Sequence, residues 1–276
     1  GIFLSGGIDS ALIAAHSRAH DPGIKAYTVR MPQPEYDESH AAAETARELG
    51  IEHSILDCSP NPAQDLITLI ETTGVPFGDS SLLPTYWLSK EVRKEVRVAL
   101  SGDGGDELFA GYQRPQIAGV LKANPGLCKL IPSLMLSQKD PRSRWTKLAR
   151  LGRAGRSDGY RSLLKIFQDQ DIRHLLGKQW DFSQRVTPFN LGFILSEMLL
   201  STLFSGERAR ENGLYWALEE DYQDYLPNDL LFKTDTASMQ VALEVRCPLL
   251  DSELVSIARN AILTILMPNG ERKGLL

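Results

Sequence analysis

The sequence lacks the features that would tie it to a membrane, to nucleic acid or to an oxidising compartment. None of its hydrophobic runs approaches the ~20 residues of a membrane span, and no secretory signal is present. The net charge is −5, and apart from a mild cluster at residues 142–156 the basic residues form no block. Nucleic acid is therefore not expected as a partner. The three cysteines are scattered without metal-ligand spacing, so a reduced, cytoplasmic protein is expected.

Two familiar nucleotide-binding motifs are missing as well. No Gly-Lys-Ser/Thr follows a glycine-rich loop, and no Gly-x-Gly-x-x-Gly occurs. The five histidines form no pair at ligand spacing. The 276 residues are 42% hydrophobic and 24% charged, which suits one large globular domain or two modest ones. The chain has no initiator methionine, which together with a glycine loop as early as residue 5 predicts a fragment of a longer protein.

The first stretch of the chain has the pattern of an anion-binding site. Hydrophobic residues 2–4 predict a buried strand that breaks at Gly6 and Gly7 and is followed by a helix. The first N–H groups of such a helix lack partners in the helix, and glycine lets the backbone approach a phosphate. Hydroxyl donors are available from Ser5 and Ser10. Asp9 would be repelled by a polyphosphate unless a cation joined them, so it indicates Mg²⁺.

The following residues alternate between predicted strands and helices. The expected strands cover residues 25–30, 52–56 and 97–100. The expected helices cover residues 38–49, with Asp37 as N-cap and Gly50 at the end, residues 62–70, with Asn61 as N-cap and an end near Gly74, and residues 85–96. This order predicts an α/β fold, with a parallel twisted sheet and helices on both faces.

A second glycine-rich loop follows the predicted strand at 97–100. Residues 101–112 contain Asp103, Asp106 and Glu107. If the first and fourth strands are neighbours, both loops meet where the strand order reverses, which is where open α/β sheets bind ligands. Asp9 could then share one Mg²⁺ with either Asp103 or Asp106.

From Tyr112 onward the patterns become mostly helical. Helices are expected at residues 148–167, 193–203 and 214–222, with core tryptophans at Trp145, Trp180 and Trp216. The predicted division is an α/β core at 1–112 and a helical lobe at 113–276 packed on that core. Near the end of the chain, Glu244, Arg246 and Asp251 are expected to form a structural ion-pair group.

Three segments together resemble the synthetase domain of the glutamine-hydrolysing asparagine synthetases, which belong to the ATP pyrophosphatases. The segments are residues 5–10, residues 101–112, and Lys233-x-Asp235-x-x-Ser238-Met239 followed by Leu243-Glu244-x-Arg246-x-Pro248-x-Leu250-Asp251. The resemblance implies an adenine nucleotide alpha hydrolase-like fold and a ligase that uses ATP and Mg²⁺. In such an enzyme the side-chain carboxylate of aspartate attacks the α-phosphate, pyrophosphate leaves, and ammonia converts β-aspartyl-AMP into asparagine and AMP.

The resemblance also implies a role for each matching residue. Pyrophosphate would be held by Ser5, Gly6, Gly7 and Ser10. Mg²⁺ would be bound by Asp9 and Asp106. AMP would contact Leu4, Val29, Ser101 and Gly102. The catalytic pair would be Asp103, an acid needed to form the intermediate, and Lys273, a cation that neutralises phosphate charge. Substrate aspartate would lie near Asp79, Ser80 and Glu107.

The sequence departs from the family pattern in three ways. Cys247 replaces a β-branched residue, and Gly274 stands where an aromatic is common. The N-terminal glutaminase of the family is absent from this chain, and Gly1 cannot serve as its cysteine nucleophile. The chain is therefore expected to use free ammonia, with the glutaminase domain as a partner in the full-length protein. A homodimer is one assembly that the sequence leaves open.

Three other functions remain open from the residues alone. A β-lactam synthetase-like relative would adenylate a different carboxylate and would need a catalytic tyrosine, for which Tyr112, Tyr160, Tyr215, Tyr222 and Tyr225 are available. A non-catalytic nucleotide-binding module would not need Asp9, Asp103, Asp106 and Lys273. A tRNA-modifying sulfur transferase would be expected to show catalytic cysteines and a basic face, and neither is evident.

Overall fold

The computed structural model describes residues 1–58, 61–75, 77–123, 160, 164 and 207–276. The chain forms two compact units, one of residues 1–111 with 221–276 and one of residues 112–220. The sequence predicts a single lobe over 113–276, whereas the structure places 221–276 with the first 111 residues. The reason is β5 (Glu244–Arg246), which pairs with β4 (Val98–Leu100) and so joins the sheet of the first unit.

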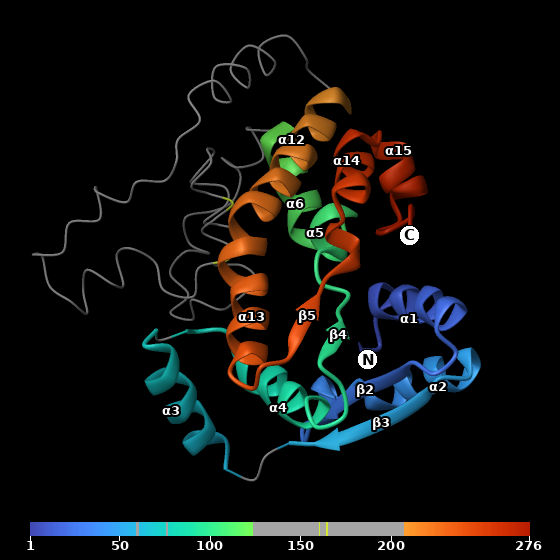
Figure 1. Cartoon of the computed structure of the whole chain (residues 1–276). Helices are drawn as coiled ribbons and strands as arrows, with labels where there is room; N and C mark the ends of the chain where they lie inside the picture. Colours follow the sequence, from blue (N-terminus) through green and yellow to red (C-terminus); the bar gives the residue numbers. More distant parts are fainter. Residues whose placement is uncertain (59–60, 76, 124–159, 161–163, 165–206) are drawn as a thin grey trace, which may run out of the picture. The chain divides into compact units, whose positions relative to one another are not determined.

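The first unit is built on a parallel sheet of five strands in the order β3-β2-β1-β4-β5 (Figure 1). The other strands are β1 (Ile2–Phe3), β2 (Lys25–Arg30) and β3 (Glu52–Asp57). Ile2 is paired with Ala26 of β2 on one side and with Leu100 of β4 on the other. The strand order therefore reverses between β1 and β4, and the predicted neighbourhood of the first and fourth strands is confirmed.

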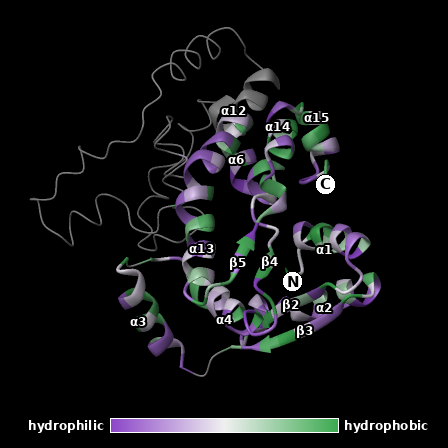
Figure 2. Ribbon diagram, in the orientation of Figure 1, coloured by the Kyte–Doolittle hydropathy of each residue, from purple (hydrophilic) through white to green (hydrophobic). Residues whose placement is uncertain are grey.

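Helices cover both faces of this sheet. Neighbouring strand residues point to opposite faces, so Ala26 packs with α1 (Ile8–His20) and α2 (Ser39–Leu49), whereas Tyr27 packs with α4 (Leu82–Val92). The predicted α/β class is thereby confirmed. In Figure 2 these helices carry both hydrophobic and hydrophilic residues, as expected for helices that face a core on one side and water on the other.

The remaining described elements of the first unit are five α-helices, three 3-10 helices and one π-helix. They are η1 (Pro34–Tyr36), α3 (Pro62–Thr73), α5 (Gly105–Leu108), the π-helix η4 (Asp221–Leu231), α13 (Phe232–Met239), η5 (Pro248–Leu250), α14 (Ser252–Asn260), α15 (Leu263–Leu266) and η6 (Pro268–Gly270). Helices α2 and α3 end at Gly50 and Gly74, both at positive φ, as the sequence predicts. Helix α4 differs, because it begins at Leu82 and ends four residues before the expected Val96.

The described part of the second unit consists of α6 (Gln113–Ala123), α12 (Glu207–Glu220) and residues 160 and 164. Trp216 is buried with Ala118 and stacks edge-on against Tyr160 at a centroid distance of 5.6 Å, so its predicted core role is confirmed. Trp145, Trp180, most of the expected helix at 148–167 and all of that at 193–203 lie outside the described residues. Among the described helices, none is long and apolar enough to cross a membrane.

Candidate functional site

The first glycine loop joins β1 to α1 and is held by its own serines. The Ser5 N–H donates to Ser10 Oγ at 3.0 Å, and the two hydroxyl oxygens lie 2.8 Å apart. The Gly7 N–H donates to Ser5 Oγ at 3.2 Å. These contacts fold the loop onto the first turn of α1, so the predicted strand, glycine turn and helix N-terminus are all present.

One N–H of this loop is occupied by a carboxylate of the chain itself. Glu38 Oε2 accepts a hydrogen bond from the Gly6 N–H at 2.9 Å. A Cβ on Gly6 would lie 3.1 Å from the Ala41 side chain, so the close approach of α2 favours glycine here. The loop therefore holds an anionic group at the N–H that the sequence assigns to pyrophosphate, and the sequence did not predict this contact.

The second glycine loop follows β4 and lies against the first. The Ser101 N–H donates to the Arg246 carbonyl at 2.8 Å, which ties the loop to β5. A Cβ on Gly102 would lie 2.9 Å from the Ser10 nitrogen, and one on Gly105 would lie 2.4 Å from Asp9 Cγ. Both glycines are thus needed for the two loops to meet at the switch point, as the sequence predicts.

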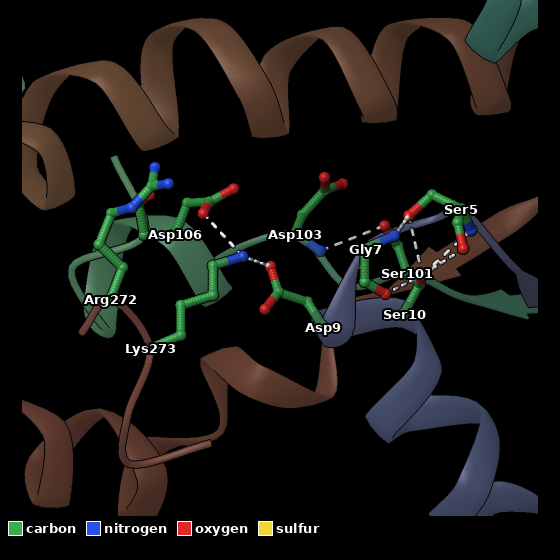
Figure 3. Close-up of polar contacts among 10 residues, drawn as sticks. Ser5, Gly7, Asp9, Ser10, Ser101, Asp103, Asp106, Arg272 and Lys273 are labelled. Carbon is green, nitrogen blue, oxygen red and sulfur yellow. Dashed lines mark hydrogen bonds and ion pairs between the residues drawn. The ribbon is translucent and has the colours of Figure 1, made fainter. Parts of the chain in front are cut away.

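A lysine from the end of the chain lies between the two acids that the sequence assigns to a metal (Figure 3). Lys273 Nζ is 2.6 Å from Asp9 Oδ2 and 2.7 Å from Asp106 Oδ1. The side chains of Lys273 and Asp9 are only 16% and 13% exposed. A Cβ on Gly111 would lie 1.7 Å from Asp106 Oδ1 and 2.3 Å from Lys273 Cε, so this glycine makes room for the ion pair.

Burial sets the protonation behaviour of this cluster. Burial raises the pKa of Asp9 and outweighs the opposing hydrogen bond and charge of Lys273. Burial alone would lower the pKa of Lys273, but the hydrogen bonds and charges of Asp106 and Asp9 outweigh it and raise that pKa. Lys273 is therefore an ammonium at neutral pH.

The cluster fits a further cation. One ammonium against two carboxylates leaves a negative charge, and Asp9 Oδ1 is buried with no hydrogen-bond partner among the described residues. Magnesium usually takes one or two carboxylates together with water and substrate phosphate oxygens. Within the described part of the chain, no group of three or more His, Cys, Asp or Glu residues lies at metal-binding distance.

Asp103 lies beside this cluster but does not join it. Its Oδ2 accepts a hydrogen bond from Thr234 Oγ1 at 3.0 Å, and its N–H donates to Ser101 Oγ at 3.3 Å. In Figure 3 the Asp103 carboxylate points away from Lys273. Burial, with the charge of Asp103 as a smaller cause, raises the pKa of Cys247 to about 12, so the thiol there stays neutral. The structure thus separates the two acids that the sequence left as alternatives, with Asp106 next to Asp9 and Asp103 turned elsewhere.

The other predicted residues lie around the same edge of the sheet. Leu4 is buried in the core at the end of β1, and Val29 packs against the core near the end of β2. Asp79 Oδ2 is 3.2 Å from Lys233 Nζ in a largely buried ion pair that the sequence did not predict. Glu107 is buried on α5. The role of these residues as AMP or aspartate contacts remains a prediction.

One expectation for the C-terminal part differs from the structure, and one departure from the family pattern is explained by it. Arg246 pairs with Glu244 at 2.8 Å, but Asp251 instead caps α14 by accepting a hydrogen bond from the Glu253 N–H. At Gly274 a Cβ would lie 2.0 Å from Pro268 Cδ, so the η6 turn leaves no room for the aromatic that is common there. Close packing against Pro268, rather than an aromatic ring, surrounds the residue after Lys273.

A parallel sheet with helices on both faces and two loops at its switch point defines an α/β domain of the adenine nucleotide alpha hydrolase-like class. The family model described as asparagine synthase matches residues 1–276. A Bacillus subtilis protein named asparagine synthetase (glutamine-hydrolysing) 1 is 31% identical over 282 residues, covering 100% of this chain and 42% of that protein. A Mycobacterium bovis protein, provisionally given the same enzyme name, is 28% identical, covering 94% of this chain and 38% of its own length.

The chain therefore belongs to the asparagine synthase family. It spans less than half the length of these two relatives. The resemblance to the asparagine synthetases, which the three sequence segments indicate, is confirmed.

Proposed function

We propose that this chain is the part of an ATP-dependent amide ligase that adenylates the side-chain carboxylate of aspartate and delivers the product to ammonia. The observation that carries the proposal is the Lys273 ammonium between Asp9 and Asp106, at the switch point where the two glycine loops meet. A site that only bound a nucleotide would not need a buried cation and two acids at the same point.

In the proposed reaction the two loops handle the phosphates. Ser5, Gly7 and the first turn of α1 supply the donors that would hold pyrophosphate as it leaves. The Glu38 carboxylate would give up its hydrogen bond with Gly6 when a phosphate oxygen arrives. Asp9 and Asp106 would hold Mg²⁺, which supplies charge neutralisation for the phosphate oxygens when it is bound. Lys273 would then turn toward the developing negative charge.

The chemistry balances in two steps. A carboxylate oxygen of aspartate forms a bond to the α-phosphorus of ATP, and the bond from that phosphorus to pyrophosphate breaks. Ammonia then attacks the activated carbonyl carbon, the bond from carbon to the bridging oxygen breaks, and AMP leaves with that oxygen while ammonia loses a proton. Asp103 would contact the reacting groups, and the Asp79–Lys233 pair offers opposite charges to an amino acid substrate.

The proposal is tested by measuring pyrophosphate release from ATP in the full-length protein, with Mg²⁺ and ammonium, with and without aspartate. Ammonium replaces any glutaminase that the full-length protein contains, so the assay reports on this site alone. Release that depends on aspartate and yields asparagine supports the proposal. Release that depends on another acid points to a relative with a different acceptor, and ATP binding without release points to a binding module.

A further inference from the structure

We propose that Thr234 is a positioning residue for the reaction, because its hydroxyl fixes the Asp103 carboxylate. The inference rests on the proposed function, in which Asp103 contacts the reacting groups. Thr234 lies in the first turn of α13 and is only 6% exposed. Its Oγ1 donates to Asp103 Oδ2 at 3.0 Å across 131 residues of sequence.

The direction of this hydrogen bond is unusual among the helical threonines that the structure describes. Helical threonines commonly donate to the carbonyl four residues earlier. Five others do so here: Thr45, Thr68, Thr72, Thr73 and Thr85. Thr234 instead directs its hydroxyl out of α13 and toward the second glycine loop. Its side chain thus serves a contact between elements rather than its own helix.

The helix that carries Thr234 is itself held in place. The neighbouring Lys233 forms the buried ion pair with Asp79. Asp79 in turn accepts hydrogen bonds from the Ser81 N–H and hydroxyl, at 2.8 Å each, immediately before α4. Ala237, one turn further along α13, packs with Leu82 of α4. The hydroxyl of Thr234 is therefore presented from a fixed backbone.

Asp103 depends on this donor for its orientation. Within the residues that the structure describes, the Thr234 hydroxyl is the one hydrogen-bond donor to the Asp103 carboxylate. The charges of Asp103 and nearby Asp9 repel each other, so no attraction to Asp9 fixes the carboxylate, and the hydrogen bond from Thr234 sets its orientation. A hydrogen bond to a charged acceptor is strong enough to select one orientation, and it leaves the other oxygen, Oδ1, for the reacting groups.

The test compares Thr234→Val, Thr234→Ser and Thr236→Val in the full-length protein. Thr236 is the matched control, because it lies two positions along the same helix and points to a different face. We expect Thr234→Val to lower kcat for aspartate-dependent pyrophosphate release by about tenfold or more, as for the loss of one charge-assisted hydrogen bond. The dissociation constant for ATP should stay within about twofold, since the hydroxyl of Thr234 bonds Asp103 and no residue of the first glycine loop, which would hold pyrophosphate.

Restoration by the hydroxyl separates positioning from packing. Thr234→Ser should recover kcat to within about threefold of wild type, and Thr236→Val should match wild type. Equal losses in Thr234→Ser and Thr234→Val would overturn the proposal, as would a Thr234→Val variant with normal kcat.

A second measurement does not depend on activity. In a double-mutant cycle on thermal unfolding, the midpoint shifts of Thr234→Val and Asp103→Ala should be non-additive. Additive shifts would overturn the inference even in a protein that shows no aspartate-dependent release. That lack of release in the wild type would instead count against the proposed function.

Discussion

Two lysines in this chain each lie between two carboxylates, at opposite ends of the same sheet. Lys25 begins β2 and is 2.9 Å from Glu52 and 3.2 Å from Glu95. Lys273 is 2.6 Å from Asp9 and 2.7 Å from Asp106, beyond the carboxyl ends of β1 and β4. The pairing chemistry is the same, but the surroundings are not.

The difference lies in burial and in what the partners leave unsatisfied. Lys25 and Glu52 are 37% and 67% exposed, so water screens their charges. At the other end, Asp9 keeps a buried oxygen that has no hydrogen-bond partner among the described residues, and a Cβ on Gly105 or Gly111 would overlap Asp9 or Asp106. The comparison teaches that a lysine between two acids marks a site only when burial leaves charge uncompensated and the backbone is shaped around it.

The largest effect on activity is expected when the lysine at the carboxyl end of the sheet, Lys273, is replaced. Lys273→Met should lower kcat for pyrophosphate release by about 10²- to 10³-fold, because a preorganised charge is lost from the leaving group. Steady-state kinetics with aspartate and ammonium measure this effect. A Lys273→Met variant with more than about a tenth of wild-type kcat would contradict the assigned role.

The next largest difference is expected between two glycine substitutions, one at each end of the sheet. Gly111→Ala should lower both kcat and the free energy of unfolding, the latter by about 1–3 kcal/mol, because the added Cβ would overlap Asp106 and Lys273. Gly23→Ala is the matched control at the other end of the sheet, where the nearest atom, an Asp21 carboxylate oxygen, lies 3.4 Å from the added Cβ. Urea unfolding and kinetics on both variants check this. Equal effects of the two substitutions would contradict a backbone shaped specifically around the ion pair.

The acids of the site should respond to pH in opposite directions. Burial alone would raise the pKa of Asp79, but hydrogen bonds from Ser81 and the charge of Lys233 outweigh it and lower the pKa. Ionised Asp79 therefore stabilises the fold above the ordinary aspartate range, and this contribution is lost as the pH falls through the lowered folded-state pKa. Burial raises the pKa of Asp9, so its contribution has the reverse sign and is lost as the pH rises through the raised value.

It follows that Asp79→Asn should reduce the free energy of unfolding at neutral pH, whereas Asp9→Asn should not reduce it. The loss in Asp79→Asn should shrink as the pH falls below about 3.9, where aspartate in the unfolded chain also becomes protonated. Urea titrations at neutral and acidic pH measure both differences. A pH-independent loss in Asp79→Asn would show that packing, and not charge, explains the effect.

The smallest effect is expected for the exposed lysine. Lys25→Met should leave kcat unchanged and the unfolding midpoint within about 3 °C of wild type, since screened surface pairs contribute little. Calorimetry and the kinetic assay test it. A loss of activity in Lys25→Met would remove the contrast between the two ends of the sheet.

Much of the first unit could be predicted because its signals are local. Strand β2 has the predicted bounds, and the glycines after α2 and α3 end those helices as expected. Strand β5 was missed because it has only three residues, Glu244, Val245 and Arg246, and so short an alternation is a weak signal on its own. Their pairing with β4 supplies the stability that the local pattern lacks.

The site was less predictable because its contacts are distant in sequence. The loop at residues 5–10 has its own pattern, but Lys273 lies 264 residues from Asp9 and would pass for a surface lysine without the family motif. The contacts of Glu38 with Gly6, of Lys233 with Asp79 and of Thr234 with Asp103 have no signature in the sequence. They arise where folded elements meet, so only three-dimensional packing shows them.

The most direct test of the central claim follows one oxygen atom. Aspartate labelled with ¹⁸O in its side-chain carboxylate is turned over with ATP, Mg²⁺ and ammonium by the full-length protein, and the AMP is analysed by mass spectrometry. If the carboxylate attacks the α-phosphorus, the AMP carries one ¹⁸O and pyrophosphate carries none. Unlabelled AMP, or label recovered in phosphate with ADP as the other product, would contradict adenylation of aspartate at this site.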